Sequence, residues 1–228
     1  ALRGGSALRF GKVLSPLAMR ELEWWEAKLG TQLGVPLASR KEWPSSSEAG
    51  MLVVYGDASR ELGNLRESGF GGWCIIGNTF YYIEGRWSEG EMLLHSINVL
   101  EHHTTDMLTG SMLDMVAARI AAGEPLAPVT HVHEFTDNTG AEHSSERGKP
   151  ASGQMHAIVA RRYAENLERR VFTHTERVTS LDNDVADGLS RGGAMQVNAL
   201  RMMASLGLRI QRVPVEPWRR SMDWLRNA

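Results

Sequence analysis

Five short stretches of the chain have the hydrophobic pattern of β-strands. Residues 51–55 are apolar throughout and lie between two glycines, which is typical of a strand buried on both faces. Two aromatic and β-branched runs, 70–76 and 79–87, are joined at Gly77-Asn78, a pair that favours a tight hairpin turn. Residues 129–136 alternate between apolar and polar, and 171–175 form a shorter run of the same kind. The pattern predicts one strand, a two-stranded hairpin and two further strands.

Helical periodicity fills the intervals between these strands. Ser88 and Glu91 have the spacing of a capping box, and apolar positions recur at helical intervals from there to about Ala122. The sequence leaves open whether this helix is continuous or breaks at Gly110. Ser15-Pro16 is a favourable helix start near the N-terminus. Further helices are predicted over 152–169, 184–190, 194–205 and 217–225, and residues 208–215 are predicted to be extended.

This order of elements predicts an α/β fold. An antiparallel hairpin followed by strands that alternate with helices indicates a mixed five-stranded sheet with helices on both faces. Residues 30–50 are rich in proline and serine and predict a linker, so we place a domain boundary near residue 48. The chain is then divided into a helical N-terminal extension (1–48), a catalytic α/β domain (49–192) and a helical C-terminal extension (193–228).

The composition is that of a globular protein, with 42% hydrophobic and 23% charged residues among 228. No apolar run approaches the ~20 residues that span a bilayer, and the first residues lack the features of a signal peptide. The single cysteine, Cys74, fits a reducing compartment, so we expect an intracellular protein, cytoplasmic or nuclear, with no membrane partner. The net charge of −2 argues mildly against nucleic-acid binding, but carboxylates that hold a metal are neutralised when it binds.

Four carboxylates occupy notable places in this pattern: Asp57, Glu101, Asp137 and Asp187. Asp57 and Asp137 follow the first and fourth predicted strands, which would meet at one edge of the sheet if those strands are parallel neighbours. Glu101 lies on the long helix at the edge of its apolar stripe, and Asp187 on the short helix 184–190. Clustered carboxylates repel one another unless a cation intervenes, and oxygen ligands favour Mg²⁺ or Mn²⁺. Two such ions can hydrolyse a phosphodiester.

Each of these acids also has a simpler interpretation. An Asp after a strand is often a turn or cap residue, and Glu101 can be a solvated helix residue. Asp184 and Asp182 compete with Asp187 for the same role. His131 and His133 share one face of a strand, as a pair of metal ligands would, but we interpret them as ordinary packing residues.

Five sequence blocks make the pattern specific. They are Gly56–Ser59, Gly69–Trp73, Ser96–Glu101, Thr136–Ala141 and Asn183–Arg191, in that order. Together they resemble the ribonuclease H domain of retrotransposon reverse transcriptases, with the greatest likeness to DIRS-like elements that integrate with a tyrosine recombinase. The resemblance covers roughly residues 50–192, and more faintly the N-terminal helix. It implies a ribonuclease H-like fold in which the four acids hold two Mg²⁺ or Mn²⁺ ions.

The resemblance also implies a substrate, an RNA–DNA hybrid whose RNA strand is cut, and a polymerase domain or larger assembly as partner. Ser59, Asn138 and Arg191, which belong to the matched blocks, are predicted to contact substrate. Arg147 and Lys149 lie in a loop before the helix at Ser152 and are predicted to grip a phosphate, although a solvated loop is an equal alternative.

The sequence departs from the family in one respect. Many ribonucleases H carry a histidine shortly before the last acid, and residues 177–181 contain none. This departure keeps two other functions open. One is a domesticated domain that acts as a structural or interaction module, and the other is a DNA nuclease or transposase core on the same fold.

Overall fold

The computed structural model describes residues 49–140, 142 and 152–215, together with positions 16, 19, 20, 22, 23, 26 and 27. Those N-terminal positions are helical, in agreement with the helix predicted after Ser15, whereas the helix predicted over 217–225 lies outside the described residues. The chain divides into two compact units, Ala1–Pro36 and Leu37–Ala228. Among the described residues, no helix is both long enough and apolar enough to cross a membrane. All that follows concerns the second unit.

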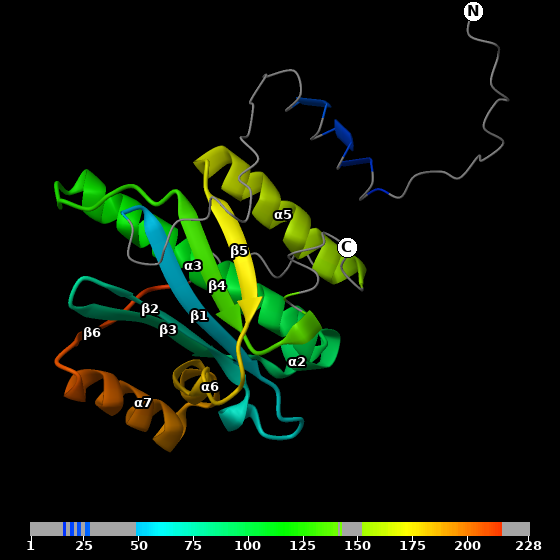
Figure 1. The fold of residues 1–228 in the computed structure, drawn as a ribbon. Helices are drawn as coiled ribbons and strands as arrows, with labels where there is room; N and C mark the ends of the chain where they lie inside the picture. The colour runs from blue at the N-terminus through cyan, green and yellow to red at the C-terminus, as the bar shows by residue number, and fades with distance from the viewer. Residues whose placement is uncertain are drawn as a thin grey trace, which may run out of the picture. The chain divides into compact units, whose positions relative to one another are not determined.

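A mixed sheet of six strands forms the centre of this unit, in the order β5-β4-β1-β2-β3-β6 (Figure 1). β1 pairs antiparallel with β2, and β2 with β3, whereas β4 runs parallel to β1 and β5 parallel to β4. The predicted α/β class, with an antiparallel start and a parallel continuation, is confirmed. The strands are β1 Met51–Ser59, β2 Gly69–Ile76, β3 Thr79–Arg86, β4 His131–Thr136, β5 Phe172–Arg177 and β6 Arg209–Arg212.

The sixth strand corrects the predicted count of five. β6 pairs in parallel with β3 at the edge of the sheet. The segment 193–215 was expected to belong to a separate extension, but its helix α7 packs on α6 and its strand completes the sheet. It is therefore part of the same compact unit as the sheet.

The helices are placed mostly where the periodicity predicts them. They are η2 Leu65–Glu67, α2 Glu89–Leu94, α3 Ile97–Ala121, α5 Gly153–Arg169, α6 Asp184–Arg191 and α7 Gly193–Ser205. The capping box at Ser88 and Glu91 is present. The long helix does break, but at His95 and Ser96, where the Ser96 hydroxyl accepts a hydrogen bond from the Val99 N–H and starts α3. The alternative break at Gly110 is wrong, because α3 continues through that residue.

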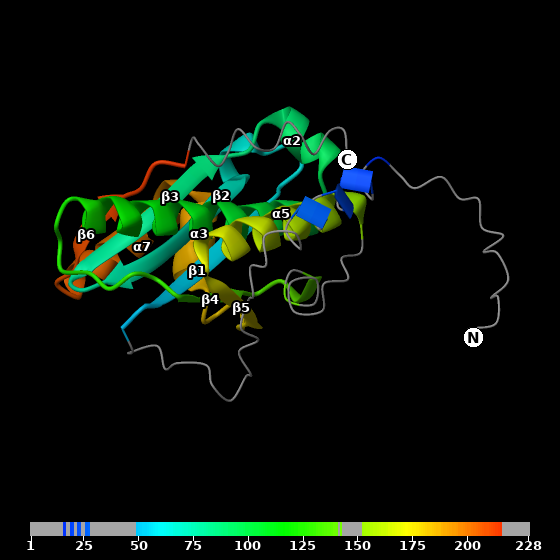
Figure 2. The same cartoon turned by 90° about the horizontal axis from the view of Figure 1, so that it is seen from above.

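Helices cover both faces of the sheet, as predicted (Figures 1 and 2). Alternate residues of β3 show this division. Tyr81 and Ile83 belong to a large core that includes Leu100 and Met107 of α3 and Ile158 of α5. Phe80 points to the opposite face and packs with α6 and α7 side chains, among them Leu189 and Met203. The period of two along the strand therefore fills two separate cores.

Candidate active site

Two acidic residues lie at the ends of adjacent parallel strands. β1 and β4 pair in parallel up to Tyr55 and Phe135. Two residues beyond that last pair the chain reaches Asp57 on β1 and Asp137 just after β4. The two strands run in the same direction, so both carboxylates lie at one edge of the sheet, where α/β proteins usually bind their ligands. The predicted condition for their meeting, that these strands are parallel neighbours, is fulfilled.

The third acid comes from α3, which packs against β1 and β2. Glu101 is 4% exposed, so it is not the solvated helix residue of the simpler interpretation. The Ala58 backbone N–H donates a hydrogen bond to its carboxylate. The Oε2 atom of Glu101 is buried and has no hydrogen-bond partner among the described residues. Oxygens of Asp57, Glu101 and Asp137 lie within 4.8 Å of one another.

Burial and mutual repulsion perturb two members of this group. Burial raises the pKa of Asp57 from 3.8 to about 7, and the charges of Asp137 and Asp187 add to the effect. Burial also raises the pKa of Glu101 well above its ordinary value, with further contributions from Asp57 and Asp137. A Ser190 hydrogen bond and the Arg191 charge oppose the rise at Asp57. A bound divalent cation would offset both the cost of burying these ionised carboxylates and the repulsion between them. Mg²⁺ and Mn²⁺ prefer oxygen ligands, so these residues fit a site for either ion.

The helix α6 packs on β1 and β2 beside this group. It carries Asp187, whose charge raises the pKa of both Asp57 and Glu101. Asp187 is partly exposed and its Oδ1 accepts from Arg191 Nε at 2.7 Å. The competitor Asp184, on the same helix, is not among the main causes of either shift. The structure thus places Asp187 near the group, although outside the set of three whose oxygens converge.

Two contacts fix α6 against β1. The Ser190 hydroxyl donates to Asp57 Oδ2, and the Asn183 side chain donates to the Gly56 carbonyl at 3.1 Å. Sequence reasoning assigned no role to either side chain, although both belong to the last matched block. The available signal was the Ser190 hydroxyl, three residues after Asp187 on a short helix. It indicates a contact with Asp57 only once α6 is known to lie on β1.

Glycines of β2 allow α6 to approach closely. A Cβ at Gly71 would lie 2.4 Å from the Cβ of Leu189 and 2.5 Å from the backbone nitrogen of Ser190. A Cβ at Gly69 would lie 2.7 Å from the Ser190 carbonyl oxygen. Real Cβ atoms do not approach so closely, so any side chain at Gly71 would displace α6. The glycine-rich block of β2 therefore supports the position of Asp187.

The end of β5 and the residues that follow it contact Asp137. The Ser180 hydroxyl donates to Asp137 Oδ2 at 2.8 Å, and Arg177 Nε donates to the Asp137 backbone carbonyl at 3.4 Å. This is the segment in which the resemblance led us to look for a histidine. A serine and an arginine contact the acid there instead, and sequence reasoning did not single them out.

The predicted substrate contacts have different outcomes. Arg191 lies beside Asp187 and is 36% exposed. Asn138 follows Asp137 directly, and its side-chain amide donates to Asn98 at 3.0 Å. Ser59 is buried; its hydroxyl accepts from the Gly69 N–H and donates to the Ser190 carbonyl, both at 3.0 Å. A substrate contact at Ser59 would require these bonds to open. Arg147 and Lys149 lie outside the described residues.

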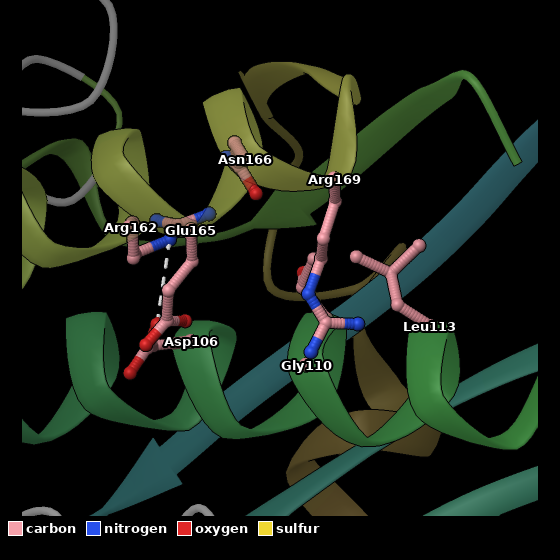
Figure 3. Close-up of a pocket in the computed structure, with 8 residues that line it drawn as sticks. Asp106, Gly110, Leu113, Arg162, Glu165, Asn166 and Arg169 are labelled. Atoms are coloured by element: carbon pink, nitrogen blue, oxygen red, sulfur yellow. Dashed lines mark ion pairs between the residues drawn. The ribbon is translucent and has the colours of Figure 1, made fainter. Parts of the chain in front are cut away.

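A separate hollow between α3 and α5 is a structural feature (Figure 3). Its volume is about 10 Å³, which accommodates roughly one water molecule. It is lined by Asp106 and Gly110 of α3 and by Arg162 and Arg169 of α5. None of the four acids lines it, so it is separate from the acidic group.

No protein-family model matches the sequence, and no match was found among curated proteins. Several solved structures are similar in fold, and three of them serve as examples. Ribonuclease H1 from the halophilic archaeon Halobacterium salinarum NRC-1 has 16% identity and a TM-score of 0.40, over 61% of this chain and 94% of that one. LC11-RNase H1 in complex with an RNA/DNA hybrid has 18% identity and a TM-score of 0.44, and the match covers 60% of this chain and 92% of that one.

The third is the foamy viral protease–reverse transcriptase in complex with an RNA/DNA hybrid, at 15% identity and a TM-score of 0.37. That match covers 68% of this chain and 22% of the viral one. Because these identities and TM-scores are low, a function for this chain has to be argued from its own residues. The α/β sheet described above, with Asp57, Glu101 and Asp137 at one edge, is the basis for that argument.

Proposed function

We propose that this chain is a two-metal-ion endonuclease that hydrolyses the RNA strand of RNA–DNA hybrids, as the ribonuclease H part of a retroelement reverse transcriptase. The observation that carries the proposal is the convergence of Asp57, Glu101 and Asp137, with oxygens within 4.8 Å of one another at one edge of the sheet. The five sequence blocks that resemble retrotransposon ribonucleases H supply the substrate class.

The chain's own residues provide the metal ligands and fix their positions. Asp57, Glu101 and Asp137 are held by β1, α3 and the end of β4, and Asp187 adds a fourth carboxylate from α6. Bound to these carboxylates, two Mg²⁺ or Mn²⁺ ions would supply the activation of a water and the stabilisation of the leaving oxygen of the phosphodiester. The Oε2 of Glu101, which has no hydrogen-bond partner among the described residues, supports this assignment, because burial beside other acids disfavours the ionised carboxylate unless a cation binds it.

Other residues would position the substrate. The Arg191 guanidinium lies beside the acids and can pair with a phosphate oxygen. Asn138, next to Asp137, carries an amide that can reach a 2′-hydroxyl, the group that distinguishes RNA from DNA. We assign Arg147 and Lys149 to the phosphate backbone of the hybrid, where cationic side chains position a duplex without reading its sequence.

The test is cleavage of labelled duplexes by the purified chain. An RNA–DNA hybrid, a DNA duplex and an RNA duplex of one sequence are incubated with Mg²⁺, Mn²⁺ or EDTA. We expect the RNA strand of the hybrid to be cut in either metal and left intact in EDTA. Asp137→Asn should lower the rate by about 100-fold or more, a loss of ~2.7 kcal/mol of transition-state stabilisation.

Asp114→Asn is the matched control, because Asp114 is an exposed acid on α3 that pairs with Arg169 at 2.8 Å. It should leave cleavage unchanged. Cleavage of the DNA duplex in preference to the hybrid would indicate a DNA nuclease or transposase core. A folded wild-type protein that cuts none of the three would contradict the proposal and favour a structural or interaction module.

A further inference from the structure

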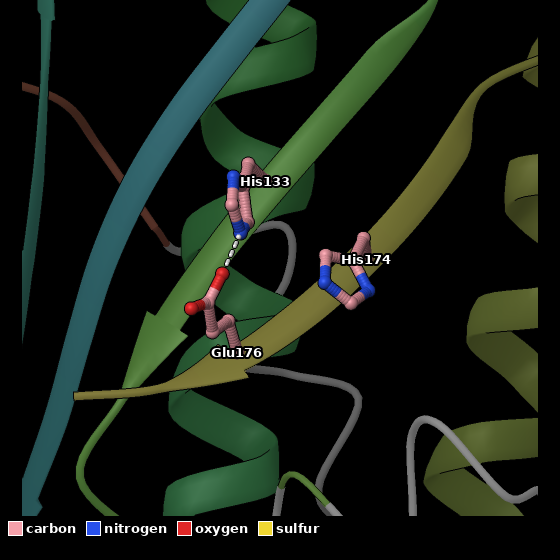
Figure 4. A group of neighbouring side chains, drawn as sticks. All are labelled: His133, His174 and Glu176. Carbon is pink, nitrogen blue, oxygen red and sulfur yellow. Dashed lines mark hydrogen bonds and ion pairs between the residues drawn. The ribbon is translucent and has the colours of Figure 1, made fainter. Parts of the chain in front are cut away.

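A second group of potential metal ligands lies on β4 and β5. His133 and His174 are directly paired in the register of these parallel strands, and Glu176 follows His174 on the same face. One ligand atom from each of the three lies within 4.8 Å of the others. Figure 4 shows His133 and Glu176 directed at one another from the two strands, with His174 beside them on β5.

This group faces away from the large core. Glu134 and Thr175, the neighbours of these ligands along the strands, point to the α3 and α5 side, where Thr109 and Arg162 contact Glu134. His133 and His174 therefore point to the opposite face. There α6 packs on β1, β2 and β3, and the two histidines are only half-buried. An ion can thus reach the group from solvent.

The distances suit a small transition-metal ion. His133 Nε2 and Glu176 Oε2 are 3.0 Å apart and share a hydrogen bond. Tetrahedral zinc has Zn–N and Zn–O bonds of ~2.0–2.2 Å, which place neighbouring ligand atoms about 3.3 Å apart. A zinc ion can replace the shared proton with little movement of either side chain, and rotation of the His174 ring would complete three ligands. Water would take the fourth position.

Packing holds one of the two histidines in place. The ring of Phe135 packs on that of His133 at a centroid distance of 4.2 Å and restricts its orientation.

We propose that His133, His174 and Glu176 form a binding site for one transition-metal ion of the zinc class. Imidazole ligands favour Zn²⁺, Ni²⁺, Co²⁺ or Cu²⁺ over Mg²⁺, so this site differs in selectivity from the all-carboxylate group. The bound ion joins the edge strand β5 to β4, immediately before the segment in which Arg177 and Ser180 contact Asp137. It stabilises the strand pair that supports that acid. The proposal is independent of the proposed nuclease activity.

The experiment is a calorimetric titration of the tag-free, EDTA-treated full chain with Zn²⁺ in excess Mg²⁺. Co²⁺ provides a second readout through its visible absorption. We expect one tight Zn²⁺ equivalent and a rise in melting temperature. His133→Ala and His174→Ala should each weaken Zn²⁺ binding by about tenfold or more, because one of three protein ligands is lost. Glu176→Gln should weaken it as well.

Two controls separate this site from its surroundings. His131→Ala removes a histidine on the same face of β4, whose ring stacks on Phe172 instead, and should retain the affinity. Asp57→Asn, in the acidic group, should also retain it. The proposal is overturned by a wild type that binds no Zn²⁺ under these conditions. It is equally overturned by an affinity that falls in Asp57→Asn but not in His133→Ala or His174→Ala.

Discussion

Replacement of Asp57 by Asn should make the metal-free protein more stable at about pH 8, although it removes a proposed metal ligand. Asp57 is 4% exposed, and its pKa is raised from 3.8 to about 7, mainly by burial and further by Asp137 and Asp187. The folded state therefore holds this proton more tightly than the unfolded state. Between these two pKa values the stability of the wild type falls as the pH rises, and above about 7 the loss is complete.

The size of the effect follows from the two pKa values. The difference between 3.8 and about 7, at ~1.4 kcal/mol per pH unit, sets an upper limit of about 4 kcal/mol. An amide at position 57 carries no charge, and its oxygen can still accept the Ser190 hydrogen bond. We therefore expect Asp57→Asn to raise the free energy of unfolding by about 2–4 kcal/mol near pH 8 in EDTA, and by less near pH 5, where much of the wild-type carboxyl is protonated.

The assay is urea unfolding of both proteins at the two pH values, with EDTA or with Mg²⁺. Mg²⁺ should stabilise the wild type, because it binds the folded state, but not Asp57→Asn. Asp114→Asn removes an exposed carboxylate paired with Arg169 and should cost no more than about 1 kcal/mol under every condition. If Asp57→Asn is no more stable than the wild type near pH 8 in EDTA, the reasoning about buried charge is refuted.

The remaining predictions concern groups that hold the site in place. Gly71→Ala should lower the free energy of unfolding by about 1–3 kcal/mol, because its methyl group would overlap α6. Gly90→Ala is the control, because its methyl group would meet open space and should change the stability little. Equal urea midpoints for the two variants would contradict this. Glu134→Ala should lower the free energy of unfolding by about 3–5 kcal/mol, since it removes the nearer of the two carboxylates that pair with the buried Arg162 guanidinium. A loss below about 1 kcal/mol in the same assay would show that the pair contributes little. Ser190→Ala should raise the pKa of Asp57, because the lost hydroxyl donates to that carboxylate; an unchanged acidic limb in the pH profile of metal binding would argue against it.

Signals that act over a few residues predicted most of the elements. The apolar run at 51–55, with a glycine on each side, predicted a strand, and the observed strand β1 continues to Ser59. Gly77 adopts a φ of 59°, which closes the hairpin between β2 and β3 as the Gly77-Asn78 pair predicted. These features need no information from distant parts of the chain.

Features that depend on distant contacts were not predictable in the same way. β6 is a short, exposed strand whose pairing with β3 joins positions about 130 residues apart, so no local pattern marks it as part of the sheet. The helix start at Ser96 was missed for a different reason. The hydrophobic repeat continues across it, and one capping hydroxyl is a weak signal beside that repeat.

The candidate site shows the same division. Its acids could be proposed from the sequence, because strand ends and ordered blocks mark them. The residues that support them, Ser180, Asn183 and Ser190, became evident only once β1, β4 and α6 were placed together. Hydroxyl and amide side chains are common on surfaces, and their partners are set by tertiary structure.

A comparison within the molecule explains why the acidic group indicates a cation. Glu134 is a fully buried carboxylate, but Arg162, Thr109 and Thr175 all donate to it, so the fold itself supplies its positive charge and its hydrogen bonds. Glu101 is equally inaccessible, yet the charges that act on it are those of other acids. The same fold therefore surrounds the Glu134 carboxylate with donors but leaves the Glu101 carboxylate beside other acids. Without a cation these buried carboxyls favour their protonated forms, as the raised pKa values of Asp57 and Glu101 indicate, whereas a bound divalent ion would let them stay ionised at neutral pH.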